Sequence, residues 1–248
     1  MSSLSGQELL HIWDVAQHQH PVSQALTILA AAEPEVNQDE LLALSIGQRD
    51  ARLLTARQAT FGSQLVGYAE CIACQERLEF TLDVADIRIT PESANNGATV
   101  NQVYEANIEG YELHFRLPNS LDFAQIAHCR DILFARTLLL QQCIVEASLD
   151  GQEVTLANLP ETVLTALADL MEKHDPQADI QLNLSCPGCG RSWPMTFDIA
   201  SFFWAEICVQ AKRLLREVHT LARAYGWREM DILSMSPARR QFYLEMVI

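Results

Sequence analysis

Two Cys-x-x-Cys motifs set far apart in the chain constrain its fold more than any other feature. The first motif is Cys71-Ile-Ala-Cys74, and the second is Cys186-Pro-Gly-Cys189. An offset of 115 residues superimposes both pairs of cysteines. The same offset aligns three further identities, which are Thr81 with Thr196, Asp83 with Asp198, and Ala85 with Ala200. The chain therefore contains an internal repeat built around a pair of thiols.

Each motif lies between two runs in which apolar and polar residues alternate. This alternation is the pattern of a β-hairpin, so we predict two hairpins that carry the cysteines at their tips. Two such tips supply four thiolates, which is the number that completes a tetrahedral structural zinc site. We therefore predict a split zinc ribbon that holds one Zn²⁺ per chain. Its ligands are Cys71, Cys74, Cys186 and Cys189.

Ordinary buried thiols, or two disulfides, are the alternative interpretation of these motifs. A disulfide within a Cys-x-x-Cys turn is typical of thioredoxin-like enzymes, in which the turn opens a helix and does not join strands. The remaining cysteines, Cys129, Cys143 and Cys208, lie in apolar helical patterns and are expected to be core residues. An odd total of seven cysteines argues against a secreted disulfide framework.

The composition indicates a globular protein with an acidic surface. The chain has 248 residues, 49% of them hydrophobic, which is enough for a sizeable core. Its net charge of −15 argues against a general nucleic-acid binder, because phosphate neutralisation needs clustered lysine and arginine. No apolar run is long enough to cross a bilayer and no charged-then-apolar leader begins the chain, so we expect a cytoplasmic protein without a membrane partner. From residue 212 onward the balance reverses, with seven basic and four acidic residues.

The patterns along the chain predict an α+β protein in four parts. Residues 1–62 are expected to form a helical N-terminal unit. Residues 63–89 and 178–199 would form the split zinc ribbon, and residues 90–177 an inserted α/β segment. Residues 200–248 would form a C-terminal helical tail. In that tail, apolar residues recur every three to four positions from Phe203 to Tyr225, which predicts one long helix that ends at Gly226.

Local signals predict several boundaries. Ser5 with Glu8, and Asn37 with Glu40, form capping-box patterns. The dipeptides 109–110 and 150–151 are hairpin turns; the first joins two strands within 103–117, and the second ends a strand that starts at Gln142. Helices are expected over 121–129 and 131–140, and a polar loop over 90–97.

Motifs of catalysis are missing from the sequence. It has no Gly-rich phosphate loop, no Gly-x-Ser-x-Gly motif and no His-Glu-x-x-His motif. No pair of carboxylates is singled out by its spacing. A catalytic zinc keeps a position open for water, and four thiolates leave none. We therefore expect a protein without enzymatic activity.

The C-terminal sequence resembles the ending of a known protein family. A long helix leads through Tyr225-Gly-Trp227 and a short helix to Arg239-Arg240-Gln-Phe-Tyr243. This arrangement resembles the T4-type baseplate hub assembly family of contractile-tailed phages. The Cys-Pro-x-Cys-Gly motif followed by Asp-x-Ala-x-Phe-x-Trp is similar to zinc-knuckle baseplate proteins of phage tails and contractile injection systems.

The resemblance implies a baseplate component or a chaperone of hub assembly, without catalytic residues. Its partners would be baseplate or hub proteins, and its location the cytoplasm during assembly or, if retained, the baseplate of the virion. A partner-binding surface is expected at five residues of the tail, which are Tyr225, Trp227, Arg239, Arg240 and Tyr243. Arginine and aromatic residues dominate interface energetics, although these aromatic residues could equally close the helical core.

Two other functions fit part of the sequence. Four thiolates also suit a rubredoxin-like site with one redox-active iron, which would make the protein an electron carrier. Such carriers are small, however, and most of this chain would be left without a role. A zinc ribbon that binds nucleic acid is the third interpretation, and the net charge argues against it.

Overall fold

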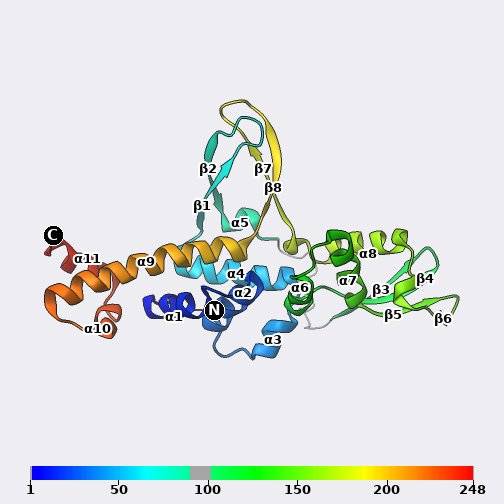
Figure 1. Cartoon of the computed structure of the whole chain (residues 1–248), viewed down its shortest axis with the longest axis horizontal. Helices are drawn as coiled ribbons and strands as arrows, with labels where there is room; N and C mark the ends of the chain where they lie inside the picture. The colour runs from blue at the N-terminus through cyan, green and yellow to red at the C-terminus, as the bar shows by residue number, and fades with distance from the viewer. Residues whose placement is uncertain (1, 90–101, 248) are drawn as a thin grey trace. The chain divides into compact units, whose positions relative to one another are not determined.

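The structure, a computed structural model, describes residues 2–89 and 102–247 of the chain (Figure 1). The chain divides into two compact units. The helical unit comprises Met1–Glu35, Thr55–Gly62 and Asp198–Ile248, and the mixed unit comprises Val36–Leu54 and Ser63–Phe197. Helices occur together with small antiparallel sheets, so the predicted α+β class is confirmed. The four-part division proposed from the sequence stays a prediction.

The helical unit is organised around α9 (Ile199–Tyr225). The buried side chains of α9 recur every three or four residues, from Phe203 through Ile207, and form one apolar stripe. Helices α1 (Gly6–Ala16) and α2 (Pro21–Ala32) pack on α9. Residues from opposite ends of the sequence therefore share one hydrophobic core.

Helix ends in this unit form where the sequence predicts them. The Ser5 hydroxyl accepts a hydrogen bond from the Glu8 N–H, and the Glu8 carboxylate accepts from the Ser5 N–H, so this capping box is confirmed. Asp198 begins α9 by accepting from two backbone N–H groups of the first turn. Gly226 ends the helix in the left-handed conformation, with a φ of 70°.

Arg57 ties the end of α4 (Ile46–Phe61) to α9. Its buried guanidinium donates two hydrogen bonds, of 2.8 and 2.6 Å, to the Glu206 carboxylate. A third bond, of 2.7 Å, goes to the carbonyl of Gly62. Paired, bidentate geometry of this kind satisfies a buried charge that would otherwise be costly.

Two short helices follow α9 and pack on it, α10 (Glu229–Leu233) and α11 (Pro237–Glu245). They enclose a small core around Val218, Leu221 and Ile232. None of the helices within 2–89 and 102–247 combines the length and the hydropathy that a bilayer crossing needs.

The mixed unit contains a four-stranded antiparallel sheet in the order β3-β4-β5-β6. The strands are β3 (Val103–Ile108), β4 (Tyr111–Arg116), β5 (Ile144–Leu149) and β6 (Gln152–Glu153). The sheet packs with α7 (Ile132–Cys143) and α8 (Glu161–His174) around fully buried side chains such as Leu113, Phe115 and Leu167. The unit also contains α3 (Gln38–Ala43), α5 (Val84–Ile87), α6 (Ser120–Ile126), and short 3-10 helices at Leu156–Asn158 and Pro176–Ala178.

Both turn dipeptides of the sheet are confirmed. Glu109 and Gly110 have φ values of 53° and 87°, and Asp150 and Gly151 have values of 51° and 74°. Two successive positive φ values are typical of the type I′ turn, whose twist matches that of the flanking strands. At Asn37, the side chain accepts a hydrogen bond from the Asp39 N–H, so this residue caps α3. The predicted capping box with Glu40 is not formed, because the bond goes to Asp39 and not to Glu40.

One predicted strand begins too early. The sequence predicts a strand from Gln142, but α7 continues through Cys143 and β5 begins at Ile144. Cys143 is completely buried in the core between helix and sheet, and an apolar residue fits either element at such a position. The polar loop predicted at 90–97 lies outside the described residues.

Two polar side chains, the half-buried Asp175 and the buried Gln177, join the segment before the second hairpin to the rest of the mixed unit. The Asp175 carboxylate accepts a 2.9 Å hydrogen bond from the N–H of Gly47, and a Cβ at Gly47 would overlap that carboxylate. The Gln177 amide accepts a 2.7 Å bond from the Ile89 N–H and donates a 3.2 Å bond to the Ile87 carbonyl. Gln177 therefore pairs with the backbone after the first hairpin as a neighbouring strand would.

Candidate metal centre

The first cysteine motif lies at the tip of a hairpin formed by β1 (Gln64–Glu70) and β2 (Arg77–Asp83). The strands are antiparallel and pair along their whole length. Gly67 lies opposite Phe80, and a Cβ at this glycine would overlap the phenyl ring. The ring therefore covers the backbone where the strand has no side chain of its own.

The second motif lies at the tip of a matching hairpin, formed by β7 (Ile180–Ser185) and β8 (Ser192–Phe197). Alternate residues of its strands are buried, among them Leu184 and the Trp193 opposite it. Both predicted cysteine hairpins are therefore confirmed.

The tips of the two hairpins meet at their sulfur atoms. All four Sγ atoms of Cys71, Cys74, Cys186 and Cys189 lie within 4.8 Å of one another. The Sγ atoms of Cys71 and Cys189 are 3.7 Å apart, and those of Cys74 and Cys186 are 3.5 Å apart. One cysteine of each motif is buried and the other is exposed, so the cluster opens to solvent on one side. We call these four side chains the sulfur cluster.

The backbone turns in the same way at both motifs. In the first, the Cys71 N–H donates to the Glu76 carbonyl and the Gln75 N–H donates to the Cys71 carbonyl, both at 2.9 Å. The corresponding bonds of the second motif measure 2.8 and 2.9 Å. The residue after the second cysteine is left-handed in both copies, with a φ of 61° at Gln75 and 73° at Gly190. The repeat seen in the sequence thus extends to backbone conformation.

The pKa values of two thiols in the sulfur cluster are shifted in opposite directions. Hydrogen bonds from backbone N–H groups, that of Cys74 first, lower the pKa of the Cys71 thiol to about 6. At Cys74 the Glu76 N–H lowers the pKa, but hydrogen bonds with the Cys186 and Cys189 thiols outweigh it and raise the pKa to about 12. One thiolate is therefore favoured and a second is opposed, which is a conflict that a bound cation relieves.

The sulfur cluster fits a tetrahedral metal ion. Zinc–sulfur bonds of about 2.3 Å in tetrahedral geometry place the sulfurs about 3.8 Å apart. The two measured Sγ–Sγ distances, 3.5 and 3.7 Å, are close to this value. Four sulfur donors in this arrangement are typical of zinc and of iron–sulfur sites.

The other three cysteines are not members of the sulfur cluster. Cys143 is buried in the core of the mixed unit, as expected, and burial raises the pKa of its thiol to about 12. Cys129 and Cys208 are half-buried, so they are only partly the core residues that their apolar surroundings predict.

The aromatic residues expected at a partner surface lie together at the end of the helical unit. The rings of Tyr225 and Trp227 stack with centroids 4.4 Å apart. The ring of Tyr243 meets both edge-on, at 5.8 and 4.8 Å. Trp227 and Tyr243 also pack against the small core of the tail, so these rings support the local fold.

The two neighbouring arginines of the tail have different surroundings. Arg239 is exposed, and its guanidinium lies 5.7 Å from the centre of the Tyr243 ring. Arg240 is 5% exposed, and it donates hydrogen bonds to the Glu217 carboxylate at 3.1 Å and to the Met235 carbonyl at 2.6 Å. Sequence analysis did not single out Glu217, although its i, i+4 spacing from a basic residue on the long helix is a signal that could have found it.

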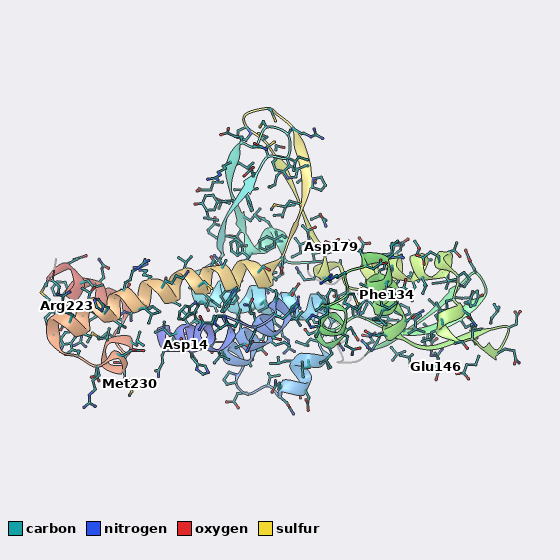
Figure 2. All side chains as sticks on the ribbon, viewed as in Figure 1. Asp14, Phe134, Glu146, Asp179, Arg223 and Met230 are labelled. Atoms are coloured by element: carbon teal, nitrogen blue, oxygen red, sulfur yellow. The ribbon has the colours of Figure 1, made fainter. Side chains whose placement is uncertain are left out.

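Three large apolar side chains are exposed in the last two helical segments of the chain. Met230, labelled in Figure 2, is 73% exposed, and Phe242 and Met246 are 61% and 55% exposed. Arg239, Phe242 and Met246 are spaced by three and four residues, so they share one side of the helical segment at the end of the chain. We call these three residues the tail stripe.

Comparison with known proteins adds to this architecture. Two cysteine hairpins that meet at a sulfur cluster, within a chain of helices and small sheets, define an α+β protein with a candidate metal centre. A sequence model of the family described as T4 bacteriophage base plate protein matches residues 15–204. The match covers well over half of the chain, so the chain belongs to this family. Searches of curated proteins and of solved structures gave no match.

The family assigns the chain a structural role in the phage baseplate, so the resemblance to T4-type baseplate proteins is confirmed. The match does not test the hub-assembly and zinc-knuckle parts of that resemblance. The matched residues include both cysteine motifs. They end at residue 204, near the start of α9, so they do not include the tail motif that first suggested the family.

Proposed function

We propose that this chain is a non-enzymatic component of the baseplate of a contractile phage tail, or of a related contractile injection system. We further propose that one structural Zn²⁺ ion holds its two cysteine hairpins together. The family match over residues 15–204 supports the first statement, and the sulfur cluster supports the second. The ion, when bound, would supply four metal–sulfur bonds between segments that are more than a hundred residues apart in the chain.

The residues of the two tips are arranged to hold such an ion. Backbone hydrogen bonds fix each Cys-x-x-Cys turn, so each folded hairpin presents its two sulfurs at one tip. The Ala73 N–H lies 3.4 Å from the Cys71 Sγ and stabilises negative charge on it. Because four protein sulfurs complete the tetrahedron, no position is left for a reacting water, and the role is structural.

Metal analysis tests the zinc proposal. The protein should be purified without added metal, and its metal content and visible spectrum measured. One colourless zinc per chain supports the structural site. Iron with visible charge-transfer absorption would instead support the rubredoxin-like alternative, which the same four sulfurs allow. A chain without metal would contradict both. Cys71→Ser should lose the metal, whereas Cys208→Ser, outside the sulfur cluster, should keep it.

We also propose that the C-terminal tail docks on a neighbouring baseplate or hub protein. The tail stripe combines exposed apolar side chains with an arginine, which is the chemistry of interface hot spots. Arg239 would contact the partner directly. Arg240 would act through the tail, because its guanidinium is occupied by Glu217 and a backbone carbonyl.

Binding measurements with purified baseplate and hub proteins of the same particle test the tail. Arg239→Ala combined with Phe242→Ala should weaken binding to one of them roughly tenfold or more, with the melting temperature unchanged. Unchanged binding to every such protein would contradict the docking role. A matched control is Arg223→Ala, which changes an exposed arginine of α9 outside the tail stripe (Figure 2).

Analysis of finished particles distinguishes a permanent component from an assembly chaperone. Quantitative mass spectrometry of purified particles should find the chain at a fixed copy number if it is a component. A chain that is absent from particles, but whose loss stops hub assembly in the cytoplasm, would be the chaperone. A chain that is absent from particles and dispensable for assembly would contradict the baseplate proposal.

A further inference from the structure

The two cysteine hairpins have the same fold, so their matching positions can be compared. Such a comparison distinguishes the residues that the hairpin fold needs from those that it does not need. Both copies contribute two sulfurs to the sulfur cluster, turn through the same backbone conformation, and end in an aspartate that caps a helix. Their inward positions are buried in the same alternating order. A difference between the copies at outward positions is therefore not required by the hairpin itself.

The outward positions differ sharply in character. In the first hairpin Val66, Tyr68 and Ile72 are 46%, 75% and 66% exposed. Large apolar residues at such exposure are costly to leave uncovered when they are neighbours on one surface. The matching positions of the second hairpin hold Gln181, Asn183 and Pro187, all of them exposed.

The charges differ as well. The segment 64–83 has four acidic residues and one basic residue, a net charge of −3. The matching segment 179–198 has two acidic residues and one basic residue, a net charge of −1. Glu79 lies directly across the strand pair from Tyr68, and Glu70 and Glu76 are exposed near the tip. The outward face of the first hairpin is thus apolar at its centre and acidic at its rim.

We propose that this face, centred on Val66 and Tyr68, docks on another baseplate protein at an apolar patch surrounded by lysine or arginine side chains. Complementary charge at the rim would orient the partner and speed its association. A second copy of this chain is a poorer occupant, because a chain of net charge −15 meets its own like charge. The inference rests on the proposed baseplate role and names the chemistry of one partner.

Site-specific photocrosslinking tests the proposal in cells that assemble the complete particle. A benzophenone amino acid is placed at Tyr68 and, as the matched control, at Asn183. We expect a crosslink from position 68 to a baseplate protein, at a segment rich in lysine or arginine, and no such product from position 183. No product at position 68, equal products at both positions, or a product with a second copy of this chain would each overturn the proposal.

Exchange of residues between the copies provides the second measurement. Val66→Gln with Tyr68→Asn installs the residues that the second hairpin already accommodates at matching positions, so the fold and metal content should not change. Affinity for the crosslinked protein should fall roughly tenfold or more, and the affinity of the unchanged chain should weaken with added salt. The reverse change, Gln181→Val with Asn183→Tyr, should leave the affinity as it is. An exchanged variant that keeps its full affinity would overturn the proposal.

The outcomes distinguish this inference from the proposed function. A chain found in the baseplate that gives no crosslink at position 68 refutes only the docking face. A chain that is absent from particles and not needed to assemble them refutes the baseplate role, and the docking face falls with it.

Discussion

At the scale of single residues, the internal repeat shows where the backbone demands a particular side chain. Gln75 and Gly190 occupy the same left-handed position after the second cysteine of each motif. A residue with a Cβ is strained there, whereas glycine is not. The first hairpin therefore carries strain that the second avoids.

Substitutions at this position should change the unfolding free energy in opposite directions in the two hairpins. Gln75→Gly should stabilise the metal-loaded protein by about 1 kcal/mol, because it removes left-handed strain. Gly190→Ala should destabilise it by about 1 kcal/mol for the converse reason. Urea denaturation of both variants beside the unchanged chain would measure the two shifts. Shifts of the same sign would show that the left-handed turns are not equivalent.

Asp175 should give stability a distinctive pH dependence. Burial raises the pKa of this carboxyl, although the hydrogen bond from the Gly47 N–H opposes the shift. Between the ordinary carboxyl pKa, about 3.9, and the raised value, the folded chain holds a proton that the unfolded chain has lost. The stability contributed by Asp175 is therefore largest at acid pH and falls as the pH rises through this window.

Asp175→Asn removes this titration and leaves an oxygen that can still accept from Gly47. The unfolding free energy of the variant, relative to that of the unchanged chain, should therefore increase as the pH rises through the window. Unfolding curves at several pH values would measure the difference, with the exposed Asp169→Asn as control. A difference that does not vary with pH would mean that the Asp175 carboxyl has the same pKa in both states.

At the scale of elements, the repeat is a unit of hairpin, cap and helix. Asp83 and Asp198 cap the helices that directly follow the two hairpins. The helix after the first hairpin has 4 residues and the helix after the second has 27. The second continues because an apolar stripe recurs along it and is buried by other helices of its unit, and packing of this kind supplies most helix stability.

Arg240 holds the last two helices of the helical unit in place through its hydrogen bonds to Glu217 and to the Met235 carbonyl. Arg240→Ala leaves Glu217 without this partner and the Met235 carbonyl without its donor. The packing of the last two helices should weaken by about 3 kcal/mol, because one member of a buried, paired set is removed. Hydrogen exchange of residues 229–247 should become faster in this variant.

Arg239→Ala is the matched control, because the neighbouring side chain is exposed. It should leave exchange of the tail unchanged. Equal exchange in the two variants would contradict an anchoring role for Arg240.

At the scale of the whole molecule, long-range contacts join parts of the sequence that are far apart. The sulfur cluster brings residues 71 and 74 to residues 186 and 189 within the mixed unit. Within the helical unit, α1 and α2 pack on α9. In each unit, bringing distant segments together reduces the conformational entropy of the chain. This loss must be offset by packing or by a bound ion.

Removing the proposed metal ion should affect only the mixed unit. Structural zinc in small domains contributes on the order of 10 kcal/mol, so Cys186→Ser should release the hairpins and leave the helical unit folded. Hydrogen exchange should rise in residues 64–83 and 180–197 and stay unchanged in α1 and α9. Cys129→Ser, outside the sulfur cluster, is the control. Equal protection of the hairpins with and without metal would contradict the structural role of the ion.

The sequence by itself determined the local features of this protein. Alternation around the cysteines determined the hairpins, Ser5 and Gly226 determined helix ends, and the turn dipeptides determined two hairpin turns. These features depend on steric preferences and hydrogen bonds among residues that are close together in the sequence.

Only the tertiary structure decided which distant groups meet. The spacing of the cysteines suggested one cluster, but the folded chain showed their sulfurs within 4.8 Å. The sequence also predicted the same role for Arg239 and Arg240. In the folded chain Arg239 is exposed, whereas Arg240 is buried and donates a hydrogen bond to Glu217. It placed the strand boundary at Gln142, whereas packing of Cys143 in the core extended the helix. Burial and partners across the chain are set by three-dimensional packing, which the order of neighbouring residues does not contain.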